Sequence, residues 1–197
     1  LYLLNIGETG SGKEHTKTVL ETMLEQAGLT DLIGPAGYTS GAGVMSTLIK
    51  KPVHVAVVDE LGRQLKAAAA TGMQHKADAL TAIMECFGRQ DGTLRPQGYS
   101  TMTLKSSEAE KLEKFVRRPS LTLVGMSTPS EFMKAIGGGD VASGLLNRFL
   151  IVKSEIGVQL SQRNSVTTIS DRLAKWANEH AHAHDGDLDA GNIHDMP

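Results

Sequence analysis

A glycine-rich segment, Gly7-Glu8-Thr9-Gly10-Ser11-Gly12-Lys13, constrains the fold of this chain more than any other stretch. The apolar run Leu1–Ile6 precedes it, and apolar residues at helical spacing follow it over Lys13–Ala27. A short apolar run is typical of a buried strand, and a repeat near 3.6 residues favours a helix. Glycines let the chain turn tightly between them, so that several backbone N–H groups converge on one anion. The segment therefore predicts a strand, a phosphate-binding loop and a helix.

The loop matches the pattern Gly-x-x-x-x-Gly-Lys, in which each part has a defined task. Backbone amides and the positive end of the following helix dipole stabilise phosphate, and Lys13 supplies a cation for the outer phosphates. The alternative is a glycine-rich turn with no ligand. We expect the nucleotide to be bound by Gly7, Glu8, Thr9, Gly10, Ser11, Gly12, Lys13 and Glu14.

Glu14 departs from the usual loop, which has Ser or Thr after the lysine to bind Mg²⁺. A carboxylate is also a hard oxygen ligand, so Glu14 is a candidate metal ligand. It would add negative charge beside the phosphates, however. The alternative is that Glu14 only favours the N-terminus of the helix.

Two adjacent acids, Asp59 and Glu60, follow a run rich in β-branched residues, Val53–Val58, which predicts a second buried strand. After such a strand, Asp59 is expected to hold Mg²⁺ and Glu60 to polarise the attacking water. Adjacent carboxylates repel, so a cation or solvent must compensate them. The alternative is that both acids cap a helix that begins at Leu61.

A third apolar run, Leu121–Gly125, ends near two hydroxyl residues, Ser127 and Thr128. We expect this strand to lie beside the first one, which would place Thr128, with Ser127 as the alternate, near the terminal phosphate. A hydroxyl at that point can sense the phosphate or position water. The competing interpretation is that Thr128 is a helix N-cap ahead of Pro129.

Strands that alternate with helices predict an α/β fold, a three-layer α/β/α sandwich around a mostly parallel sheet. Ligands of such sheets bind at the carboxyl ends of the strands, and this is where the loop, the acidic pair and Thr128 fall. A fourth strand is predicted over Phe149–Val152 and a helix over 107–116, and a final helix is expected to carry Ile169, Leu173 and Trp176 on one face. We expect an ATPase core over residues 1–160, a C-terminal helix over 161–180 and a polar, disordered tail over 181–197.

Four segments together resemble a known family, the helicase-like ATPase domains of phage and plasmid primase-helicases. They are Gly7–Lys13, Val58–Gly62, Ser127–Pro129 and Gly144-Leu145-Leu146-Asn147-Arg148-Phe149. The resemblance implies a P-loop NTPase of the additional-strand class, RecA- or AAA-like, assembled as a homo-oligomeric ring. It also implies that Arg148 acts on the nucleotide of the neighbouring subunit. The alternative for Arg148 is a surface arginine at a strand edge.

Contact with DNA is a further expectation, based on the stretch Gly92–Lys105 and the single aromatic residue within it, Tyr99. Related helicases place a DNA-touching hairpin there, and stacking within a basic groove is how single strands are held. The alternative is a solvated loop and helix face. The basic residues in and near this stretch are Arg89, Arg95, Lys105, Lys114, Arg117 and Arg118.

The composition fits these expectations without adding a ligand of its own. A net charge of −2 gives no global signal for nucleic acid, so any DNA contact must be local. A single cysteine, Cys86, excludes an internal disulfide and fits the reducing cytoplasm. No apolar run is long enough to span a bilayer. Because the loop follows the first residues so closely, we expect the chain to be part of a longer protein.

The sequence therefore predicts an ATPase that needs ATP and Mg²⁺ and couples hydrolysis to unwinding or remodelling of single-stranded or forked DNA. Two rivals remain open. One is a P-loop kinase or phosphotransferase, which would need an acceptor pocket. The other is a nucleotide-binding switch module with little hydrolysis, for which Glu14 is the best support.

Overall fold

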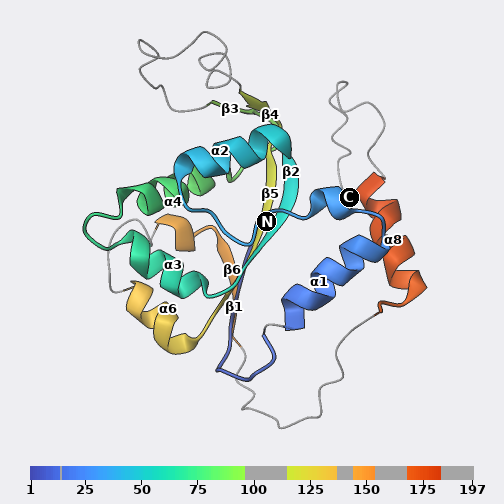
Figure 1. Cartoon of the computed structure of the whole chain (residues 1–197), viewed down its shortest axis with the longest axis horizontal. Coiled ribbons are helices and arrows are strands. Elements are labelled where there is room, and N and C mark those ends of the chain that lie inside the picture. Colours follow the sequence, from blue (N-terminus) through green and yellow to red (C-terminus); the bar gives the residue numbers. More distant parts are fainter. Residues whose placement is uncertain (14, 96–114, 137–143, 154–167, 183–197) are drawn as a thin grey trace.

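Four parallel strands form the sheet that organises the chain (Figure 1). The computed structural model describes residues 1–13, 15–95, 115–136, 144–153 and 168–182. The strand order is β2-β5-β1-β6, so β5 is inserted between the first two strands of the chain. A single parallel bridge from Ile33 to Val55 extends the sheet beyond β2. The strands are β1 (Tyr2–Ile6), β2 (Val53–Val58), β5 (Ser120–Ser127) and β6 (Phe149–Lys153).

The register brings the carboxyl ends of three strands to one edge of the sheet. Ile6 of β1 pairs with Ser127 of β5, and Val58 of β2 pairs with Gly125 of the same strand. Residues that directly follow these strands must therefore emerge side by side. This register also confirms the expectation that the third strand predicted from the sequence lies beside the first.

Helices cover both faces of the sheet (Figure 1). The larger core includes Tyr2, Leu4 and Ile6, which lie on one face of β1 and pack with residues of α2, α3 and α4. On the opposite face, α1 and α8 pack together through Leu24 and Ala177. The helices are α1 (His15–Gln26), the 3₁₀ turn η1 (Thr30–Leu32), α2 (Gly41–Lys50), α3 (Leu61–Ala68), α4 (Gln74–Cys86), α6 (Pro129–Ile136) and α8 (Asp171–His182).

These observations confirm the predicted α/β class with a parallel sheet between helices. The four strands expected from apolar runs all form. β-branched residues fit the pleated, largely buried surface of a strand such as β2, whereas β6 is exposed after Phe149. Within the described residues, the helices are too short or too polar to cross a membrane.

Two local predictions differ from the structure, and a third falls mostly outside the described residues. Val116 does not belong to the helix expected over 107–116, because it lies in β4 (Val116–Arg117), which pairs antiparallel with β3 (Thr93–Leu94). Thr93–Leu94 therefore finds its partner outside the stretch 92–105 in which a hairpin was expected, and residues 96–114 lie outside the described ranges. The C-terminal helix begins at Asp171, so Ile169 precedes it and does not share its apolar face.

His54 is a buried polar residue on β2, with an exposed fraction of 1%. Its Nδ1 lies 2.7 Å from the carbonyl oxygen of Lys51, which can only accept, so Nδ1 carries the hydrogen. The Tyr38 hydroxyl, 2.5 Å from Nε2, then donates to the other ring nitrogen. Burial lowers the pKa of His54 below its ordinary value of 6.5, although the hydrogen bond to Lys51 opposes this shift. The fold therefore favours the neutral imidazole.

This preference predicts that acid destabilises the protein through His54. The unfolded chain takes up a proton near pH 6.5, whereas the folded chain takes it up only at lower pH, so stability falls as pH drops below about 6.5. Thermal unfolding of the wild type and of His54→Phe at pH 7.5, 6.5 and 5.5 measures the effect. The wild type should lose more stability than the variant over this range. His75→Gln, at an exposed position on α4, is the control, and equal slopes for wild type and His54→Phe would contradict the prediction.

Candidate functional site

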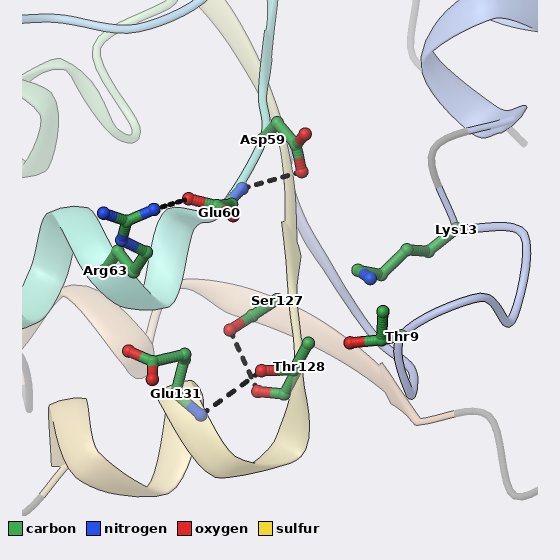
Figure 2. Close-up of a pocket in the computed structure, with 8 residues that line it drawn as sticks. All are labelled: Thr9, Lys13, Asp59, Glu60, Arg63, Ser127, Thr128 and Glu131. Atoms are coloured by element: carbon green, nitrogen blue, oxygen red, sulfur yellow. Dashed lines mark hydrogen bonds and ion pairs between the residues drawn. The ribbon is translucent and has the colours of Figure 1, made fainter.

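A pocket of about 130 Å³ opens at the edge of the sheet where β1, β2 and β5 end (Figure 2). Segments that are far apart in the sequence supply its walls: the loop after β1, the turn after β2, the end of β5 and the first turns of α3 and α6. Its lining residues are Thr9, Lys13, Asp59, Glu60, Arg63, Ser127, Thr128 and Glu131.

The loop after β1 is fixed by its own backbone and by β5. The N–H of Gly7 donates to the carbonyl oxygen of Ser127 at 3.1 Å, and that of Ser11 donates to Glu8 at 3.0 Å. Gly10 and Gly12 have φ angles of 81° and 88°, a left-handed conformation that other residues adopt only with strain. The glycines at these two positions are therefore what allows the loop to take this shape.

Lys13 is the last described residue before α1 and is only 8% exposed. Its side chain points into the pocket, on the opposite side from Glu60 and Arg63 (Figure 2). A lysine is seldom so deeply buried unless its charge is compensated, and Lys13 does have an interaction partner. The pocket thus presents a cation on a wall that faces carboxylates.

Asp59 and Glu60 lie on the opposite wall, directly after β2. The carboxylate of Asp59 accepts the N–H of Glu60 at 2.8 Å, and Glu60 takes a left-handed conformation with φ 51°. The Glu60 carboxylate accepts from the guanidinium of Arg63 at 2.5 Å. Figure 2 shows it turned along α3 and away from Lys13. Glu60 occupies the N-cap position of α3 without a side-chain cap bond, so its carboxylate does not cap that helix.

Ser127 and Thr128 close the pocket at the end of β5. The buried Ser127 hydroxyl donates to the carbonyl oxygen of Thr128 at 3.1 Å. The N–H of Glu131 donates to the Thr128 hydroxyl at 3.4 Å, and the N–H of Phe132 donates to its carbonyl oxygen at 3.0 Å. Thr128 therefore caps the N-terminus of α6, which was one of the two roles expected from the sequence. Its hydroxyl still lines the pocket, so capping and phosphate sensing are compatible.

Two lining residues, Arg63 and Glu131, were missed by the sequence analysis. Arg63 stands three residues after Glu60, a helical spacing that brings the two side chains together. Glu131 stands three residues after Thr128, the spacing of a capping box, and this signal could have marked it. A hydrogen bond from Lys134 lowers the pKa of the Glu131 carboxyl, and the charges of Lys134, Lys66 and Arg63 add to the shift.

The remaining predicted site residues are placed as follows. Gly7, Glu8, Gly10, Ser11 and Gly12 form the loop without being among the lining side chains. Glu14 lies outside the described residues.

Arg148 lies at the opposite end of the strands from the pocket, because Phe149 pairs with Tyr2 at the start of β1. β1 has five residues, so at 3.3 Å per residue the two ends of the strand are roughly 17 Å apart. Arg148 therefore does not belong to the pocket of its own chain.

The donors in the pocket fit a magnesium ion that comes with a phosphate ligand. Mg²⁺ is usually held by one or two carboxylates together with substrate phosphates and water. The exposed carboxylate of Asp59 suits such a shared shell. Among the described residues, no group of three or more His, Cys, Asp or Glu side chains is arranged to hold a metal by itself.

No protein-family model matches the chain, and no curated protein matches it at the required significance.

Close packing between α3 and α6 sets the width of the pocket wall. A Cβ added to Gly62 would collide with the Ser127 hydroxyl oxygen and would lie 3.1 Å from the backbone of both Glu131 and Phe132. Only a glycine lets the two helices approach this closely. Because α3 carries Glu60 and Arg63 while α6 carries Glu131, this contact also positions the site.

We therefore predict that Gly62→Val destabilises the protein by about 1–3 kcal/mol, the usual range for overpacking a filled site. Urea unfolding of the purified variant gives the value. Gly92→Val is the matched control, because the nearest atom to its added Cβ would lie 3.8 Å away. If both substitutions have the same effect, the packing explanation is wrong.

Proposed function

We propose that this chain is a Mg²⁺-dependent ATPase domain of the P-loop type. The observation that carries the proposal is the convergence of Lys13, Asp59 and Thr128 on one pocket from three separate strand ends. A triphosphate in this pocket would meet the loop amides and Lys13 on one side and the carboxylates on the other. This is the arrangement that phosphoryl transfer requires.

The strand order supports the additional-strand class within these ATPases. In β2-β5-β1-β6, the strand that ends in Ser127 separates the loop strand from the strand that ends in the acidic pair. A RecA- or AAA-like domain has a strand inserted at this position, as the resemblance to primase-helicase ATPases implies.

Each lining group has a role in the proposed reaction. Amides of the loop and the ammonium of Lys13 bind the β- and γ-phosphates. Asp59 would hold Mg²⁺, which would neutralise charge on the phosphate oxygens. Glu60 accepts a proton from the attacking water, whose oxygen bonds to the γ-phosphorus while the bond to the β-phosphate oxygen breaks. Thr128 donates a hydrogen bond to the terminal phosphate.

Glu60 must leave Arg63 to act as the base. The two side chains are 58% and 66% exposed, and an exposed ion pair contributes only about 0.2–1 kcal/mol. Breaking the pair is therefore a small barrier for a bound triphosphate, whose negative charge also attracts the guanidinium. The nonhydrolytic switch module is the second candidate, since Glu60 is turned away from Lys13 in this structure.

Arg148 is proposed to complete the site of a neighbouring subunit in a homo-oligomeric ring. It stands far from the pocket of its own chain, as a residue that acts between subunits must. Single-stranded or forked DNA is the proposed partner of the assembly in the cytoplasm, with unwinding or remodelling as the work done. Among the described basic residues, Arg117 and Arg118 lie close to Gly92 through the β3–β4 pair.

The first test is Glu60→Gln, which keeps the shape of the side chain and removes the base. Turnover should fall by about 10²–10⁴-fold, while ATP binding measured by calorimetry is retained. Lys13→Ala should weaken ATP binding itself. A wild type that binds ATP without hydrolysing it would favour the switch module. If Lys13→Ala binds ATP as tightly as the wild type, the proposed site is wrong.

The second test addresses the contribution of Arg148 from a neighbouring subunit. Arg148→Ala should retain ATP binding and lose about 10³–10⁵-fold in turnover, because a transition-state arginine is worth that much. Steady-state hydrolysis is measured at several protein concentrations, with and without single-stranded DNA. Dependence of the rate on protein concentration reports assembly, and stimulation by DNA reports the partner. Unchanged turnover of the assembled variant would refute this role.

A further inference from the structure

The Arg148 guanidinium is held in place by contacts that none of the preceding roles explain. Its Nη1 donates to the carbonyl oxygen of Gly144 at 2.5 Å. Its Cζ lies 5.9 Å from the centroid of the Phe87 ring, within the range of a cation–π interaction. A carbonyl and an aromatic face therefore fix a long side chain that would otherwise sample many rotamers.

The Phe87 ring is itself fixed from behind. It meets the ring of Tyr2 edge-on, with centroids 5.1 Å apart, and Tyr2 is anchored because its hydroxyl donates to the carbonyl oxygen of Ile83 at 2.6 Å. α4 ends at Cys86, and Phe87 takes an extended conformation. The ring thus has a rigid support on β1.

Phe87 is 42% exposed, so its contacts with the core do not enclose the ring completely. One side of the ring packs on Tyr2, and Arg148 lies over it. Fixing an arginine before it meets its ligand reduces the entropy lost on contact.

We propose that Phe87 is the positioning residue of Arg148, holding the guanidinium ready for the nucleotide of the neighbouring subunit. This inference rests on the proposed function, because it needs Arg148 to act between subunits. Phe87 touches neither the nucleotide nor the pocket of its own chain. Its effect passes through Arg148 alone, in the transition state and not in the binding of ATP.

The test compares Phe87→Leu, Phe87→Met and Phe87→Tyr in the assembled protein. Leu and Met should lower kcat about two- to fivefold, the worth of an exposed cation–π contact, with KM for ATP unchanged. Tyr keeps the aromatic face and should restore wild-type turnover. Thermal unfolding of each variant identifies any that fail to fold. If one of the two apolar variants does not fold, the other still allows kcat to be compared with that of Phe87→Tyr.

Phe115→Leu is the matched control, because Arg117 lies over the Phe115 ring at 5.5 Å in a similar pair. Measured without nucleic acid, it should leave turnover unchanged. A loss of the same size in this variant would overturn the assignment, as would wild-type kcat in Phe87→Leu.

Mixing subunits separates a role between chains from a structural one. An excess of Glu60→Gln chains, which keep Phe87 and Arg148, should restore the turnover of each Phe87→Leu chain. An excess of Arg148→Ala chains should not. If Glu60→Gln chains give no rescue, Phe87 acts within its own chain and the inference fails. If Arg148→Ala itself hydrolyses ATP normally, the proposed role of Arg148 fails with it. A wild type that does not hydrolyse ATP would refute the ATPase proposal as a whole, whereas an active Glu60→Gln variant would exclude only Glu60 as the base.

Discussion

The hydrogen-bond ladders from β5 to its two neighbours are the constraint on which the site depends. They bring the end of β1, the end of β2 and the end of β5 to one edge. Everything chemical at that edge follows from this register, because a shift by one residue would turn each strand over and bury the other set of side chains. The loop adds to the constraint through the bond from Gly7 to Ser127.

Close helix packing supplies the second condition. α3 and α6 approach each other at Gly62, and the residues at their N-terminal ends face the same pocket. In each helix a first-turn side chain lines the pocket together with the residue three positions before it. Arg63 of α3 does so with Glu60, and Glu131 of α6 does so with Thr128. The site is thus a product of strand register and helix contact together, and neither element alone would form it.

Much of this could be predicted from sequence because strong local signals coincide with the fold. Runs such as Val53–Val58 are long enough and apolar enough to mark strands, and the glycine–lysine loop marks the strand end at which a ligand binds. Val116 was assigned wrongly because its strand has two residues and depends on a partner more than twenty positions away. Arg63 was missed because a lone arginine on a helix carries no motif; only the three-dimensional turn after Asp59 brings it to the pocket. The position of Arg148 relative to the pocket also needed the strand register, which sequence patterns do not contain.

The left-handed backbone at Glu60 has a consequence for how this chain could evolve or be engineered. A non-glycine residue with φ 51° carries strain of about 1–3 kcal/mol that the surrounding structure must sustain. Glycine or asparagine at this position would relieve the strain and make the chain more stable, but would remove the carboxylate from the pocket. Selection for thermostability alone would therefore favour glycine or asparagine over glutamate at this position.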